Sequence, residues 1–152
     1  GNICRSPLAQ GVFEALTKNE NLQNQILVSS AGTSHWHVGN PPDSRMQQTA
    51  RSHNVLLTSR GRQFQASDFK QMDLVLAMDH SNLNILQQMR PEAELQDKLF
   101  LFRSFDPDNN GDLDVPDPYY GGDQGFENVY QMVERTCPKV LDHLKTQLAN
   151  KT

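Results

Sequence analysis

The chain has 152 residues, which is the size of one domain, and its composition excludes several classes of protein. Hydrophobic residues make up 36% and charged residues 21%, as in an ordinary globular protein and unlike a disordered chain. The formal net charge of −4 argues against a nucleic-acid partner. No apolar stretch is long enough for a transmembrane helix, so we expect no membrane partner. The two cysteines cannot build a disulfide-rich secreted scaffold, and we expect a cytoplasmic protein.

The first half of the chain shows helix and strand patterns in turn. Ser6 and Pro7 precede apolar residues at helical spacing, which predicts a helix to about residue 18 with Ser6 as its N-cap. A short apolar run at 26–28 predicts a buried strand. A Pro-Asp pair at 42–43 opens a second helix that should extend to about residue 53.

The second half continues the alternation and ends in a long amphipathic helix. Asp, Pro, Gly and Asn dominate one segment, which predicts a loop. The predicted elements are strands at 74–77 and 98–102, a helix at 80–89, the loop at 103–124, and a final helix at 125–148.

Short apolar strands between helices indicate an α/β fold with a parallel sheet. We predict a three-layer, flavodoxin-like fold in which helices flank a four-stranded parallel sheet of order 2-1-3-4. Only three strands are visible, and a gap at the internal first position would leave backbone groups of the flanking strands unpaired. We therefore expect the first strand to lie before residue 1 and to be absent from this sequence. Residues 1–152 would then be a single domain truncated at its N-terminus.

Residues 1–5 would form the turn between that strand and the first helix. A Gly-containing turn at a helix N-terminus points consecutive backbone N–H groups at one place, where a tetrahedral oxyanion can bind. Arg5 adds a planar guanidinium that can hold two phosphate oxygens at once. An ordinary capping turn with a solvated Arg5 is the alternative that these residues leave open.

Residues 1–7, Gly-Asn-Ile-Cys-Arg-Ser-Pro, resemble the phosphate-binding loop of the low-molecular-weight protein tyrosine phosphatases. The family motif is Cys-x-Gly-Asn-x-Cys-Arg-Ser, and its first Cys is the nucleophile. Residues 115–122, Val-Pro-Asp-Pro-Tyr-Tyr-Gly-Gly, resemble the family's general-acid loop, and the order and spacing of further segments fit over essentially the whole chain. The nucleophilic Cys would lie two positions before Gly1 and is not in this sequence.

The resemblance implies a phosphatase that hydrolyses phosphotyrosine through a phosphocysteine intermediate, with no cofactor and no metal. Its partners would be phosphotyrosine proteins or aryl phosphates, and inorganic phosphate or a similar oxyanion. Arg5 would stabilise charge on the phosphoryl oxygens, and Asp117 would protonate the leaving tyrosyl oxygen as the general acid. The phosphate-binding residues would be Gly1, Asn2, Ile3, Cys4, Arg5 and Ser6.

Three aromatic residues are expected to line the substrate slot by the same resemblance. They are Trp36, Tyr119 and Tyr120, which would stack on the aryl ring. The apolar side chain of Ile3 suits a flat aryl phosphate, whereas the related arginine phosphatases typically carry Thr at this position.

Further residues are expected to support the phosphate-binding loop. Ser30 would join the hydrogen-bond network that holds the loop, together with Asn2 and Ser6. Asp79 either caps the helix that follows it or pairs with Arg5. By analogy with some relatives, Cys4 would be able to form a regulatory disulfide with the nucleophile.

Alternative functions start from other patterns. The acidic run at 106–114 fits the first nine positions of an EF-hand loop, with Asp117 at the twelfth, although its prolines and the lack of an entering helix argue against calcium binding. A non-catalytic phosphotyrosine-binding module would need the anion site but no thiol. Arsenate reduction on the same fold would need two further cysteines near 75–90, where none occurs.

Overall fold

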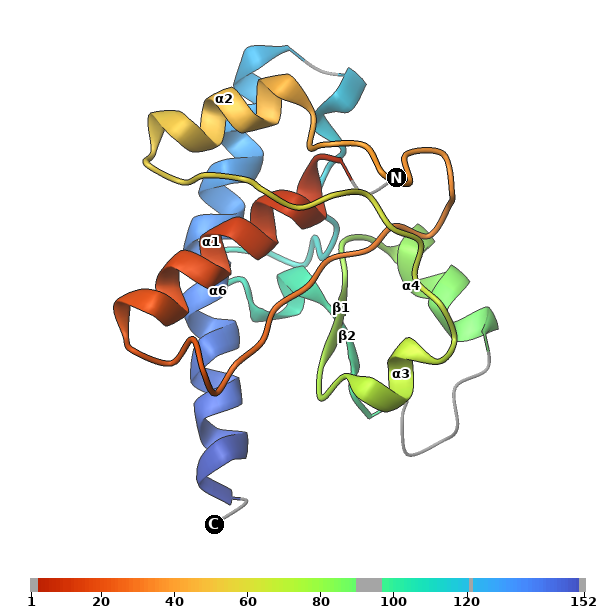
Figure 1. The fold of residues 1–152 in the computed structure, drawn as a ribbon, viewed down its shortest axis with the longest axis vertical. Coiled ribbons are helices and arrows are strands. Elements are labelled where there is room, and N and C mark those ends of the chain that lie inside the picture. Colours follow the sequence, from red (N-terminus) through yellow and green to blue (C-terminus); the bar gives the residue numbers. More distant parts are fainter. Residues whose placement is uncertain (1–2, 90–96, 121, 151–152) are drawn as a thin grey trace.

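The computed structural model describes residues 3–89, 97–120 and 122–150 as an α/β arrangement. In Figure 1 two short strands run between two groups of helices, with the long C-terminal helix along one side. Among the described residues, no helix has both the length and the apolar character needed to cross a bilayer. The elements are α1 (Arg5–Asn19), α2 (Ser44–Ser52), α3 (Asp68–Gln71), β1 (Val75–Ala77), α4 (His80–Gln88), β2 (Leu99–Leu101), the 3-10 helices η1 (Phe102–Phe105) and η2 (Pro118–Tyr120), and α6 (Asp123–Asn150).

The strands β1 and β2 are parallel neighbours, in agreement with the predicted fold class. Val75 lies opposite Leu99 and Ala77 opposite Leu101, while α4 lies between the two strands in the sequence and contacts both. The strands predicted at 74–77 and 98–102 and the helix predicted at 80–89 are therefore confirmed. The four-strand order 2-1-3-4 stays a prediction.

The strand predicted at 26–28 is not formed in the structure. Ile26 and Val28 pack against the core and Leu27 points outward, so the alternation of a strand is present. A strand also needs a neighbour to complete its backbone hydrogen bonds, and no described residue pairs with this segment. The apolar pattern is therefore present at 26–28, but among the described residues this segment has no backbone ladder to make it a strand.

The first helix begins one residue before the predicted cap. Leu8 N–H donates to the carbonyl of Cys4, and the backbone of Cys4 is already in the helical region, with φ −119° and ψ −78°. Cys4 therefore takes the N-cap position and Ser6 lies inside the first turn. The prediction of Ser6 as the N-cap is wrong because the helical turn starts upstream of it.

The main core lies where α1 and α2 pack on α6 (Figure 1). The segment that follows α2 approaches α1 closely because α1 carries a glycine on that side: a Cβ on Gly11 would lie 2.5 Å from the Leu57 side chain. The largest fully buried side chains of this core include Leu8, Met46, Val115, Phe126, Val129, Val133 and Leu141.

A buried ionic cluster fastens the acidic loop that follows η1. Asp106 has no exposed side-chain surface, and its carboxylate accepts hydrogen bonds from Arg103 (3.0 Å) and from Arg135 of α6 (2.8 and 3.0 Å). Burial acts to raise the pKa of Asp106, but the hydrogen bonds from Arg135, the Asp108 N–H and Arg103 together lower it below the usual carboxyl range. The Asp106 carboxylate thus ties the beginning of the loop that leads to Asp117 to α6.

We expect Asp106→Asn to lower the free energy of unfolding by about 3–5 kcal/mol at pH 7, because it removes the buried anion shared by two guanidinium groups and leaves them only the exposed carboxylates of Asp112 (3.4 Å from Arg103) and Asp108 (3.9 Å from Arg135). The lowered pKa means that this stabilisation is complete above the unfolded-state pKa of about 3.9 and is lost as the pH falls through the folded-state value. Urea unfolding at pH 7 and pH 3 measures both effects, and the gap between wild type and variant should shrink at pH 3. Asp108→Asn, in the exposed part of the same loop, should cost less than about 1 kcal/mol. Equal losses for the two variants would contradict this account.

Candidate active site

Arg5 joins three distant segments at the carboxyl end of β1. From the first turn of α1, its Nη1 donates to Asp79 Oδ2 (2.6 Å) and to the carbonyl of Val115 (2.8 Å). The Val115 N–H in turn donates to the carbonyl of Met78 (2.8 Å). The Arg5 side chain is only 14% exposed, so its charge is held in place and not free in solvent. The start of α1, the end of β1 and the predicted acid loop therefore meet at one guanidinium.

Asp79 performs both of the roles that the sequence left as alternatives. Its Oδ1 accepts the Asn82 N–H (2.7 Å) and caps α4, while its Oδ2 accepts the bond from Arg5. Arg5 uses only Nη1 for these contacts. The Nε–Nη2 edge of its guanidinium receives no acceptor from the described residues, and a phosphoryl group has the geometry to take that edge.

The phosphate-loop residues that the structure describes are Ile3 to Ser6; Gly1 and Asn2 lie outside the described residues. Ile3 packs partly against the core, and its carbonyl accepts the Asp43 N–H (2.7 Å). Cys4 is buried, and its pKa is raised to about 12, chiefly by burial and then by the negative charges of Asp43 and Asp117. At neutral pH Cys4 is thus a protonated thiol.

The predicted general acid lies near the start of α1. Asp117 is close enough to Cys4 for its charge to raise the pKa of that thiol, and its Oδ1 accepts the Tyr119 N–H (3.0 Å). Tyr119 is exposed in η2. Tyr120 ends the same short helix, and its side chain lies outside the described part of the chain.

Ser30 is held by α1 and not by a loop residue that the structure describes. Its hydroxyl donates to the Gln10 side-chain oxygen (2.6 Å). The expected network of Ser30 with Asn2 and Ser6 stays a prediction.

Trp36 stands on an exposed loop that is pinned by Gly61. The indole is 77% exposed and stacks on His35, with 5.5 Å between ring centroids. Gly61 closes the loop with two backbone bonds of 2.8 Å, because its carbonyl accepts Gly39 N–H and its own N–H donates to Asn40. No described contact ties Trp36 to Arg5 or Asp117, so its part in substrate binding is a prediction.

We expect Gly61→Ala to displace the Trp36 loop, since an added Cβ would lie 2.0 Å from the carbonyl oxygen of His37. Hydrogen exchange by mass spectrometry should show faster exchange of residues 33–40, and the single indole N–H cross-peak should shift. Gly122→Ala is the matched control, because its Cβ would meet no atom within 4 Å. Unchanged protection of 33–40 in Gly61→Ala would show that the loop is not pinned at this position.

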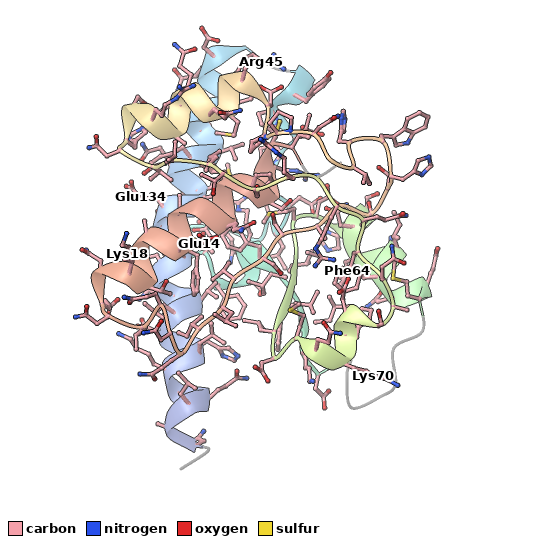
Figure 2. All side chains as sticks on the ribbon, in the orientation of Figure 1. Glu14, Lys18, Arg45, Phe64, Lys70 and Glu134 are labelled. Atoms are coloured by element: carbon pink, nitrogen blue, oxygen red, sulfur yellow. The ribbon has the colours of Figure 1, made fainter. Side chains whose placement is uncertain are left out.

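Sequence reasoning missed a pair of charged residues beside the site. Asp43 caps α2 by accepting the backbone N–H groups of Arg45 (2.8 Å) and Met46 (3.4 Å). Arg45, labelled in Figure 2 at the start of α2, pairs with the Asp43 carboxylate and donates to the carbonyl of Tyr119 (3.1 Å). The Pro-Asp-Ser-Arg sequence at 42–45 showed the helix start but gave no sign of the contact with residue 119.

The contacts of the acidic loop argue against the EF-hand alternative. Asp106 is occupied by Arg103 and Arg135, and Asp114 Oδ1 accepts the N–H and Nδ1 of His80 (2.9 and 2.6 Å). Within the described ranges, no three His, Cys, Asp or Glu side chains are grouped as metal ligands. Asp106 and Asp114, which the pattern places at its first and ninth positions, serve instead to fasten the loop.

Comparisons with known proteins agree with this arrangement. The family profile "Low molecular weight phosphotyrosine protein phosphatase" matches residues 1–150. A low molecular weight protein-tyrosine-phosphatase of Streptomyces coelicolor is 42% identical over 149 residues, which cover 97% of this chain and 91% of that protein. A crystal structure of protein tyrosine phosphatase from Entamoeba histolytica with Hepes in the active site superposes with a TM-score of 0.91 at 36% identity, covering 97% of this chain and 93% of that one. A Drosophila arginine phosphatase superposes with a TM-score of 0.84 at 35% identity, covering 95% and 93% of the two chains. This chain therefore belongs to the low molecular weight phosphotyrosine protein phosphatase family.

Proposed function

We propose that this protein hydrolyses the phosphate ester of phosphotyrosine, or of an aryl phosphate, through a cysteine-bound phosphoryl intermediate. The observation that carries the proposal is the double contact of Arg5 with Asp79 and Val115, which brings the start of α1 and the loop of Asp117 together. Backbone N–H groups at the N-terminus of α1 and the Nε–Nη2 edge of Arg5 would bind the phosphoryl oxygens.

The chemistry divides between a thiolate and Asp117. The thiolate attacks phosphorus as the bond to the tyrosyl oxygen breaks, and Asp117 gives its proton to that leaving oxygen. The resulting carboxylate then takes a proton from water, which attacks the phosphocysteine and releases inorganic phosphate and the thiolate. A tyrosyl oxygen has a pKa of about 10, and general-acid assistance typically contributes about 10²–10⁴-fold.

Neither cysteine of this sequence is suited to be the nucleophile. Burial raises the pKa of Cys137 to about 12, and burial with nearby carboxylates does the same for Cys4. A nucleophilic thiol needs the opposite environment, with helix N–H groups and a cation that lower its pKa. We infer that the nucleophile comes from a segment that precedes Gly1 and enters beside Arg5.

A cavity of about 560 Å³ could accommodate such a segment. It lies between the 26–31 segment and β1, is lined by apolar side chains such as Val28, Leu76 and Val140, and reaches Arg5 and Ser6. The Val75 N–H donates to the carbonyl of Lys98, so the backbone groups of Val75 face β2. Backbone groups of successive residues in a strand face opposite sides, so the N–H and carbonyl of Leu76 face away from β2. An extended apolar strand in this cavity would find backbone partners on β1 and would end at the phosphate loop.

The test uses the protein with its natural residues upstream of Gly1. Replacement of the cysteine that the family motif places two positions before Gly1 by serine should abolish release of phosphate from a phosphotyrosine peptide, while Cys4→Ser should retain it. A phosphoarginine peptide, measured in parallel, should be hydrolysed less well. Turnover that persists in the first variant would overturn the proposed mechanism, and binding of phosphate without turnover by the wild type would identify a binding module.

We expect Asp79→Asn to lower kcat/KM for aryl phosphates by about 10- to 100-fold, which corresponds to the loss of one hydrogen bond between charged groups. The asparagine oxygen still caps α4, but it no longer fixes Arg5 by charge. The variant also leaves the largely shielded Arg5 without its carboxylate partner, so we expect a lower melting temperature, and kcat/KM is compared at a temperature at which the variant is folded. A variant with wild-type kcat/KM would show that Asp79 does not orient Arg5.

A further inference from the structure

Arg45 lies in the first turn of α2, and its side chain reaches across to η2. Its guanidinium pairs with the Asp43 carboxylate through Nη2 (3.2 Å) and donates to the carbonyl of Tyr119 (3.1 Å). The same group lies over the ring of Phe126, 4.7 Å from its centroid, and over the ring of Tyr119 at 5.4 Å. These contacts fix a flexible side chain in one orientation.

One end of this bridge is tied to the phosphate loop. The backbone N–H of Asp43 donates to the carbonyl of Ile3 (2.7 Å), one residue before Cys4. The Asp43 carboxylate caps α2 and pairs with Arg45 at the same time. Burial acts to raise the pKa of Asp43, but the hydrogen bonds from Arg45 and Met46 outweigh it and lower the pKa, so Asp43 is an anion at neutral pH.

The other end is tied to the predicted general acid. The Tyr119 N–H donates to Asp117 Oδ1 (3.0 Å), while the Tyr119 carbonyl accepts from Arg45. The peptide groups of one residue are thus held on one side by Arg45 and on the other by Asp117. The contacts run without a break from Ile3 through Asp43, Arg45 and Tyr119 to Asp117.

We propose that Arg45 is a positioning residue, which sets the distance between the phosphate loop and Asp117 so that the carboxyl group meets the leaving oxygen. The inference rests on the proposed phosphatase mechanism and extends it to a residue outside both sequence motifs. Proton transfer needs hydrogen-bond distance between the acid and the leaving oxygen. A displacement of about 1 Å costs up to about 10²-fold in rate.

If Arg45 only stabilised the fold, its replacement would lower kcat/KM equally for all substrates. The Arg45 side chain is 43% exposed, and exposed ion pairs add little to stability. Replacement by Met keeps an unbranched chain over Phe126 but removes the donors to Asp43 and Tyr119. The variant should fold, and its effect should fall on proton donation and not on all substrates equally.

The experiment compares kcat/KM for phenyl phosphate and 4-nitrophenyl phosphate in the active protein with its own upstream residues. Nitrophenol is the stronger acid, so its departure needs little proton donation, whereas phenol has a pKa near that of tyrosine, about 10. In Arg45→Met, kcat/KM for phenyl phosphate should fall about tenfold or more, and the value for the nitrophenyl ester should fall by less than about threefold. Asp117→Asn sets the scale of the full effect.

Two further variants act as controls. Arg45→Lys, which can still donate to Tyr119 but lacks the planar fork, should recover part of the loss. Arg51→Met removes an exposed arginine from the end of α2. Among the described contacts, Arg51 Nε donates only to the Gln47 carbonyl (3.4 Å), so this variant should leave kcat/KM unchanged for both esters. Equal losses on both esters in Arg45→Met, or no loss on either, would overturn the positioning role. A wild-type protein that hydrolyses neither ester would instead overturn the proposed function on which the inference rests.

Discussion

The site depends on the ion pair of Arg5 with Asp79, to which the Val115 carbonyl adds a second acceptor. A parallel strand, a helix N-terminus and an acidic loop each have reasons of their own to fold, but none of them sets where the others lie. The shared guanidinium does, because both of its contacts at Nη1 are short and the side chain is largely shielded from water. Arg5 is oriented by the fold before any ligand arrives, which is the condition for electrostatic stabilisation of a transition state.

The loop that carries Asp117 is fixed at several points along its length. Asp106 ties its beginning to α6 through Arg135, Asp114 ties its middle to the N-terminus of α4 through His80, and Tyr119 ties its end to α2 through Arg45. The loop has little regular structure, so it is held by charged side chains and backbone groups of its neighbours and not by the backbone hydrogen bonds of a sheet. Two of the aspartates in this loop, Asp106 and Asp114, already have hydrogen-bond partners, so their charges would oppose an anion at the proposed phosphate site less than free carboxylates would.

Much of the fold was predictable because it depends on local patterns. The helical periodicity of α2, α4 and α6 and the apolar runs of β1 and β2 can be read from the sequence, and so can the motifs that contain Arg5 and Asp117. The four-residue helix α3 was not predicted, because it is too short for a periodic pattern and depends on Phe69 packing against Phe64. The two roles of Asp79 were both expected, but only as alternatives, because the cap is local and the pair with Arg5 spans 74 positions. The contact of Arg45 with Tyr119 spans the same separation and was not predicted, because local sequence carries no information about such distances.

The most direct test of the central claim is a crystal structure of the protein, with its upstream residues, bound to vanadate as an analogue of the phosphoryl transition state. The account predicts that the equatorial oxygens accept hydrogen bonds from the Nε–Nη2 edge of Arg5 and from N–H groups at the start of α1, with Arg5 Nη1 still on Asp79. The Asp117 carboxyl group should lie within hydrogen-bond distance of an apical oxygen. Vanadate bound without contact to Arg5, or Asp117 turned away from it, would contradict the account.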